Sequence, residues 1–108
     1  MALASNEIVQ QTAIAMMHDC DNIIGRLTAT KMSLTQSTTD LLAFSSTLDP
    51  ESPEMKQIER RRQMLAAYEK KIDAEIQQYK NRRQMAEGLL QSATHNVDRA
   101  IQRGFMRR

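Results

Sequence analysis

The sequence predicts an all-α protein, an antiparallel two-helix coiled-coil hairpin that assembles into a larger helical oligomer. A heptad pattern of apolar residues marks the first half of the chain, and the segment Asp49-Pro50-Glu51-Ser52-Pro53 interrupts any helix, because proline breaks the backbone hydrogen-bond ladder. The 108 residues include no Trp, two Phe and two Tyr. A helix pair of this size buries only a thin apolar stripe, so we expect it to need a partner.

The first helix is expected over residues 5–47, with Ser5 as its N-cap, and would be about 65 Å long. Its apolar residues alternate at spacings of four and three, which is the pattern of a coiled-coil seam. The seam consists of Val9, Ala13, Met16, Cys20, Ile23, Leu27, Thr30, Leu34, Ser37, Leu41, Phe44 and Leu48.

The second helix is expected over residues 53–105, after a turn at 49–53, so that residues 1–108 form one hairpin. Ser52 would cap this helix, with Pro53 at the favoured first helical position. Its seam consists of Ile58, Leu65, Tyr68, Ile72, Ile76, Tyr79, Ala86, Leu90, Ala93, Val97, Ile101 and Phe105. Consecutive spacings of four at Tyr68-Ile72-Ile76 and at Val97-Ile101-Phe105 predict stutters, which locally unwind a left-handed supercoil.

Folding back about the turn pairs residues whose numbers sum to about 100. The last turns of the second helix would then extend beyond the start of the first. We expect their apolar residues to bury surface against another chain, and a frayed terminus is the alternative. These expected interface residues are Val97, Ile101, Phe105 and Met106.

Gly25 and Gly88 lie inside the expected helices, where glycine costs about 1 kcal/mol relative to alanine. Gly88 would lie near Ala13, where a close approach of two backbones explains it. Gly25 has no such explanation and is expected to mark a bend.

Small uncharged side chains dominate the outer face of the first helix. From Asn22 to Leu48 the charged residues are Arg26, Lys31 and Asp40, and Ser and Thr replace the Glu and Lys of an ordinary exposed helix. Small neutral side chains pack closely without removing ions from water. We expect Thr28, Thr35 and Thr39 to contact neighbouring copies, and a polar face in water is the alternative.

The net charge of +2 is unevenly distributed, with an acidic first arm and a basic second arm. The arms, or neighbouring copies, can therefore attract each other modestly. Arg60, Arg61 and Arg62 come without interleaved aromatic residues, so the sequence does not favour nucleic-acid binding.

The sequence contains no motif for catalysis, a cofactor or a small-molecule substrate, so we expect no enzyme activity. His18, Asp19, Cys20 and Asp21 are consecutive and point around a helix, so they predict no metal site. Cys20 is the one cysteine, which excludes an intramolecular disulfide.

Nothing in the sequence predicts a conventional signal peptide or a membrane span. The N-terminal part lacks a basic segment, and its apolar stretch over residues 14–17 is short. Export would therefore use a route that does not read such a signal.

The turn Pro50-Glu51-Ser52-Pro53 and the end of the second helix, Val97-Asp98-Arg99-Ala100-Ile101-Gln102-Arg103-Gly104-Phe105, resemble the needle subunits of type III secretion systems. That resemblance implies a hairpin that polymerises into a hollow filament, is exported without a cleaved signal and contacts other secretion-apparatus proteins. It also implies that Ile101 and Phe105 lie in the inner packing layer and that Arg99 and Arg103 face the lumen.

The leading hypothesis is a structural, self-assembling subunit of an extracellular or secretion-associated helical filament. Such a protein would be secreted or at the cell surface by a signal-peptide-independent route. The alternative is a cytoplasmic adaptor or export chaperone that forms a closed helical bundle with a protein partner.

Overall fold

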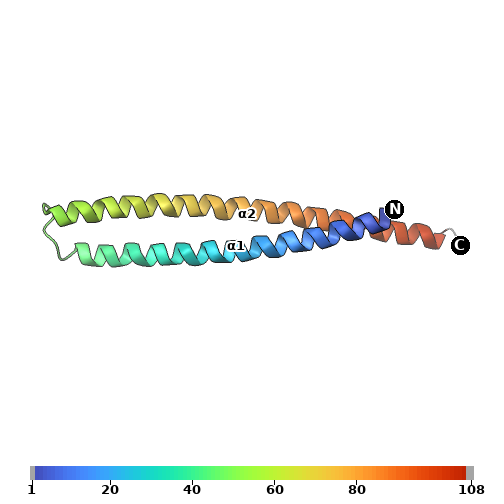
Figure 1. Ribbon diagram of the computed structural model, residues 1–108, viewed down its shortest axis with the longest axis horizontal. Helices are drawn as coiled ribbons and strands as arrows, with labels where there is room; N and C mark the ends of the chain where they lie inside the picture. Colours follow the sequence, from blue (N-terminus) through green and yellow to red (C-terminus); the bar gives the residue numbers. More distant parts are fainter. Residues whose placement is uncertain (1, 107–108) are drawn as a thin grey trace. The chain divides into compact units, whose positions relative to one another are not determined.

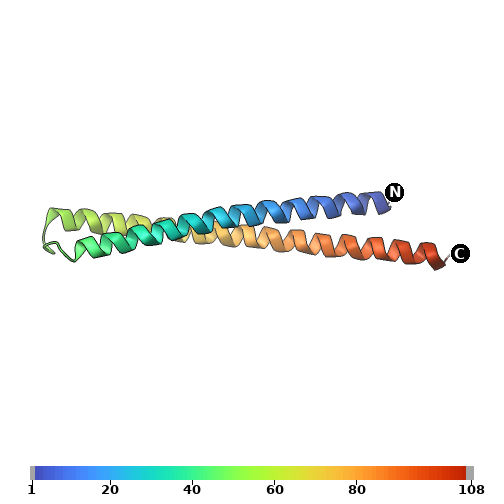
Figure 2. The ribbon, with the colours of Figure 1, turned by 90° about the horizontal axis from the view of Figure 1, so that it is seen from below.

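The computed structural model describes the backbone of residues 2–106 and the side chains of residues 5–104. Two α-helices make up this part of the chain: α1 spans Ala2–Ser45 and α2 spans Pro53–Met106 (Figure 1). From the turn, α2 runs back alongside α1 in both views (Figure 2). The predicted all-α, antiparallel two-helix hairpin is therefore confirmed, and the oligomer stays a prediction.

Side-chain hydroxyls terminate α1 at Ser45. The hydroxyls of Ser45, Ser46 and Thr47 donate to the carbonyl oxygens of the residues three positions before them, at 2.8, 2.7 and 2.7 Å. The Ser46 hydroxyl thereby supplies a donor to the Ala43 carbonyl, while the Leu42 and Phe44 carbonyls also accept the backbone N–H groups of Ser46 and Thr47, at 3.3 and 3.1 Å. The helix begins at Ala2, so Ser5 lies inside it and the predicted Ser5 cap is wrong.

Ser52 caps the start of α2, as predicted. Its Oγ accepts a hydrogen bond from the backbone N–H of Met55 at 3.2 Å, and Pro53 is the first helical residue. Before it, Asp49 Oδ1 accepts from the N–H of Glu51 at 3.1 Å, which tightens the turn. Glu54 lies in the first turn of α2, where a negative charge stabilises the helix N-terminus.

The chain divides into two compact units, each a piece of antiparallel hairpin. The terminal unit contains the described residues up to Ile24 and from Gln78 onward, and the turn unit is Gly25–Gln77. In both units, paired residue numbers sum to 104, against an expectation of about 100. The polar pairs that show this register are Gln10–Thr94 and Asp21–Arg83 in the terminal unit, and Lys31–Asp73 and Thr35–Glu69 in the turn unit.

The core of each unit is small. In the terminal unit the buried residues are Ala13, Cys20, Ala86 and Ala93, and in the turn unit they are Ile58 and Ile72. No large side chain among the described residues is fully buried. The core therefore gives each unit little apolar burial, and further stability has to come from elsewhere.

The seam of α2 follows an unbroken heptad over its described length. Its buried and half-buried residues are Met55, Ile58, Arg62, Leu65, Glu69, Ile72, Ile76, Tyr79, Arg83, Ala86, Leu90, Ala93, Val97 and Ala100. Glu69 and Ala100 occupy the seam where Tyr68 and Ile101 were predicted, so the predicted stutters are wrong. Charged side chains can lay their aliphatic stems along a seam and keep their heads in water. A prediction based on apolarity alone therefore placed Tyr68 on the seam instead of its neighbour Glu69.

The seam of α1 consists of two rows, and one of them agrees with the prediction. The residues of its two rows, all buried or half-buried, are Asn6, Gln10, Ala13, Met17, Cys20, Ile24, Leu27, Lys31, Leu34, Thr38, Leu41 and Ser45, followed by Leu48 after the helix. The row from Ala13 to Leu48 is common to both. The second row lies one residue later along the chain than predicted, because α2 contacts the other flank of the shared row.

Gly25 and Gly88 have no steric role in the hairpin. A Cβ at Gly25 or Gly88 would meet no atom within 4 Å, so the predicted backbone approach at Gly88 is wrong. Neither glycine has a positive φ, and α1 stays helical through Gly25.

We predict that Gly25→Ala and Gly88→Ala each stabilise the protein, by about 0.5–1 kcal/mol, because alanine loses less backbone entropy in a helix. Thermal unfolding followed by circular dichroism measures the effect as a higher melting temperature. Ala86→Gly, at a buried seam position, is the control and should lower it. A lower melting temperature for either Gly→Ala variant would contradict the open space seen at these positions.

Candidate interaction surface

A third, partly apolar row lies on α1 beside its seam. It consists of Val9, Met16, Ile23, Thr30, Ser37 and Phe44. A helix that faces one partner buries two heptad rows, so a third row remains at the flank. Val9, Met16 and Phe44, which were predicted on the intramolecular seam, are accordingly 37%, 38% and 57% exposed, while Ile23 is half-buried.

The other predicted seam residues lie on the interface between the helices. In the turn unit these are Leu27, Leu34, Leu41, Leu65 and Ile76, which are half-buried, and Ile58 and Ile72, which are buried. In the terminal unit Leu90 is half-buried. The helix interface is thus made largely of the aliphatic residues expected there.

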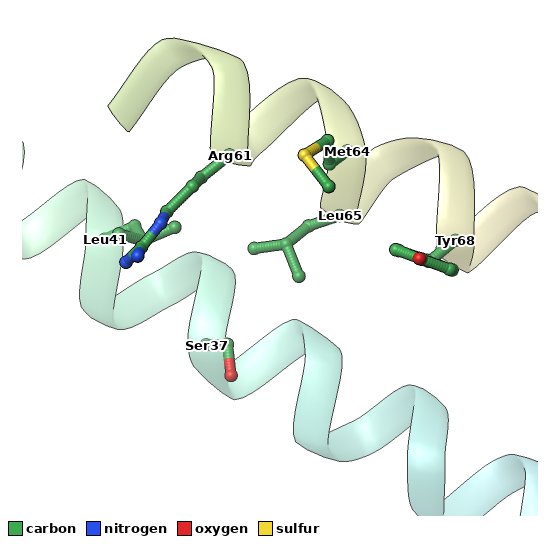
Figure 3. A pocket seen from close by; sticks show the side chains of 6 residues that line it. All are labelled: Ser37, Leu41, Arg61, Met64, Leu65 and Tyr68. Carbon is green, nitrogen blue, oxygen red and sulfur yellow. The ribbon is translucent and has the colours of Figure 1, made fainter. Parts of the chain in front are cut away.

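An apolar groove opens on the flank of the turn unit that carries the third row. Its lining residues are Ser37 and Leu41 of α1 and Arg61, Met64, Leu65 and Tyr68 of α2, and it encloses about 320 Å³ (Figure 3). Met64 and Tyr68 are more than half exposed. We call this flank the open side.

Polar contacts bridge the helices on the opposite flank of the turn unit, which we call the paired side. Lys31 Nζ lies 2.7 Å from Asp73 Oδ1, and the Thr35 hydroxyl lies 3.3 Å from Glu69 Oε1. Ser37 and Thr38, adjacent in sequence, lie on opposite flanks of the Leu34–Leu41 row, because heptad geometry places such neighbours on either side of a seam. The two helices are thus joined by polar bonds on one flank and left apolar on the other.

The terminal unit has its own polar contacts and its own exposed apolar residues. Arg83 Nε lies 2.7 Å from Asp21 Oδ1, and Gln10 Nε2 donates to Thr94 Oγ1 at 3.1 Å. Arg83 also approaches Glu87 within 3.5 Å. The exposed large apolar residues of this unit are Ile8, Val9, Ile14, Met16, Met85, Leu89 and Ile101.

Arg99 and Arg103, predicted to face a filament lumen, lie in the terminal unit. Both are exposed and line a polar hollow of about 420 Å³ together with Ser5, Asn6, Asn96 and Ala100. Of the predicted C-terminal interface residues, Val97 is half-buried on the α2 seam and Ile101 is 48% exposed. The side chains of Phe105 and Met106 lie outside the described residues.

The predicted threonine face consists of exposed residues whose hydroxyls bond within the chain. Thr35 and Thr39 donate to the carbonyl oxygens of Lys31 and Thr35, each at 3.0 Å, and Thr28 is exposed as well. A hydroxyl bonded to its own helix can be covered by another chain without losing its acceptor. Because Thr35 also approaches Glu69, this face adjoins the paired side rather than the groove.

Over the residues that the structure describes, no group of three or more His, Cys, Asp or Glu side chains could hold a metal ion. Asp21, which shares a helix face with His18, pairs with Arg83. Cys20 is a buried free thiol. Within the same residues, neither helix is long and apolar enough to cross a membrane.

The chain matches no model of a known protein family, no curated protein and no solved structure. Its function is therefore inferred from its surface, which has exposed apolar side chains and, in the turn unit, one polar-bonded flank and one open flank.

The Lys31–Asp73 ion pair predicts a stability loss at high pH. The hydrogen bond and charge of Asp73 raise the pKa of Lys31 above its usual 10.5, with partial burial acting weakly in the opposite direction. A lysine whose folded pKa is raised adds stability below its unfolded pKa and loses it as the pH rises through the folded pKa.

Thermal unfolding across pH 9 to 12 should therefore show a decrease in melting temperature above about pH 10.5 that is weaker in Lys31→Met. Lys70→Met removes an exposed lysine that has no ion pair within residues 5–104, and it should keep the wild-type profile. Identical profiles for wild type and Lys31→Met would show that this pair does not hold the helices together.

Proposed function

We propose that this chain is a structural subunit that self-associates into a helical, needle-like filament, either extracellular or associated with secretion. The observation that carries the proposal is the combination of a very small core with many exposed large apolar side chains. These are Ile8, Val9, Ile14, Met16, Met32, Leu42, Phe44, Met64, Tyr68, Met85, Leu89 and Ile101. Soluble monomers expose such residues singly, whereas recurring ones indicate protein contact surfaces.

The energetics of a small hairpin support a helical partner. A hairpin with so small a core depends on other sources of stability, of which disulfides, a metal and oligomerisation are the usual ones. Cys20 is the single cysteine, so no disulfide joins the two helices. Helices of neighbouring copies would supply the missing apolar contacts.

Both units carry exposed apolar side chains, such as Phe44 and Tyr68 in the turn unit and Met85 and Leu89 in the terminal unit. An open filament needs at least two separate contact surfaces on each subunit, and a single patch would give only a closed pair. This distribution supports an extended assembly.

The resemblance of the turn and of the segment 97–105 to needle subunits adds to the proposal. Ile101 is exposed, as an assembly contact must be in the free subunit, and Arg99 and Arg103 are exposed polar residues near it. By this proposal the chain is exported by a signal-peptide-independent route, its partners are further copies and other secretion-apparatus proteins, and Arg99 and Arg103 line the lumen.

Negative-stain microscopy and sedimentation of the purified protein test the proposal, and we expect filaments. Changing Ile101 and Phe105 together to Ser should raise the concentration needed for assembly by about tenfold or more, because apolar anchors carry most of the energy of such contacts. The helical circular dichroism signal should change little, since Ile101 is exposed in the hairpin.

Gln102→Ser is the matched control, because it changes an exposed polar residue in the same helical turn. Filaments that form equally well from the double variant would exclude the C-terminal turns from the contact. A wild type that gives only small particles would contradict the filament and favour the adaptor or chaperone hypothesis.

A further inference from the structure

Within the turn unit, an exposed aromatic side chain and an apolar groove share the open side. Phe44 is 57% exposed and lies seven residues after Ser37, a groove residue, so both lie on one row of α1. Asp40 lies one helical turn before Phe44, on the same part of the helix surface. A surface that carries both a protruding group and a matching groove can pair with itself about a two-fold axis.

Charged residues at the groove also favour a second copy of this chain as its occupant. Arg61 lines the groove, and its side chain extends from α2 toward Leu41 of α1 (Figure 3). Among the described residues Arg61 forms no hydrogen bond or ion pair, whereas Arg62 beside it pairs with Glu59. Asp40 accepts a hydrogen bond from the Gln36 amide at 3.0 Å, and no cation within the described part of the chain pairs with it.

The hairpin register fixes where these groups lie. Because the residue numbers of the pairs Lys31–Asp73 and Thr35–Glu69 sum to 104, Arg61 lies opposite residue 43 of α1 and Leu65 lies opposite residue 39. An antiparallel second copy that brings its Phe44 to the level of residue 40 must bring its Asp40 to the level of residue 44. Phe44 of the second copy then lies over Leu65, and its Asp40 lies beside Arg61.

A parallel second copy does not give this match. With its Phe44 at the level of residue 40, its Asp40 would lie at the level of residue 36, which faces position 68 of α2 rather than Arg61. Only the antiparallel arrangement satisfies the apolar and the charged contact together, and it does so twice, once in each copy.

We propose that two copies of this chain pair antiparallel through the open side of the turn unit. Phe44 of each copy fills the groove formed by Leu41, Met64, Leu65 and Tyr68 of the other, and Asp40 of each pairs with Arg61 of the other. This inference deepens the proposed function, on which it rests for the identity of the partner. The pair is a closed contact, so the exposed residues of the terminal unit remain for extension of the filament.

Sedimentation equilibrium of the full-length chain and its variants tests the pairing. Phe44→Ser should weaken the pair by about tenfold or more, because it removes the central aromatic anchor. Met32→Ser is the matched control, since Met32 is also exposed on α1 of the turn unit, at 69%, but does not line the groove. Helical content should equal that of the wild type in both variants.

Charge reversal provides a second, independent readout. Asp40→Arg and Arg61→Asp should each weaken the pair several-fold, because each places like charges together in the interface, and the double variant should restore it. Misfolding could weaken the pair in either single variant, but it could not restore the pair in the double variant.

The outcomes separate the pairing from the proposed function. If the wild type associates but Phe44→Ser and Met32→Ser behave alike, or if the double charge variant stays as weak as the single ones, the pairing is wrong while self-association stands. If the wild type is monomeric at every concentration, both proposals are wrong.

Discussion

The structure depends on one geometric constraint: a helix that packs against a single partner can bury two heptad rows. On α2, the two seam rows include Arg62, Glu69 and Arg83, which keep their charges at the edge, and Met64, Tyr68, Met85 and Leu89 stay exposed outside these rows. On α1, three adjacent rows contain apolar residues. One hairpin therefore cannot cover them, and Val9, Met16 and Phe44 stay at the surface. The exposed apolar row is a consequence of having two helices rather than three or four.

Because one flanking row of α1 faces α2 and the other is exposed, the two flanks of the turn unit differ in polarity. The helices meet on the flank where α1 offers Lys31 and Thr35, and these residues contact Asp73 and Glu69 across the seam. Exposed ion pairs add little stability, but they favour one register over its neighbours. The other flank of the turn unit keeps Phe44, Met64 and Tyr68, together with Asp40 and Arg61, whose charges have no partner of opposite sign among the residues that the structure describes. Polar pairing within the chain thus lies on one flank of the turn unit, and the exposed apolar side chains lie on the other.

The sequence predicts the helices, the turn and the Ser52 cap because prolines and heptads act locally. It does not predict which flank of α1 faces α2, since Val9 and Phe44 are more apolar than Gln10 and Ser45, which lie on the seam. That choice comes from the register between two helices, which is a non-local property. The same limit explains why Tyr68 was predicted on the seam in place of Glu69. Tyr68 is the more apolar of the two residues, but it is the exposed one. The groove beside Leu65 needs both helices in place, and no pattern along one helix could reveal it.

The central claim is that contacts with other copies add to the stability of this hairpin. The most direct measurement is the melting temperature, followed by circular dichroism, over a wide range of protein concentration. Association coupled to folding makes the melting temperature rise with concentration, whereas an independently stable monomer unfolds at one temperature. We expect a continuous rise across the series. A melting temperature that is high and independent of concentration would contradict the account, because the small core would then suffice by itself.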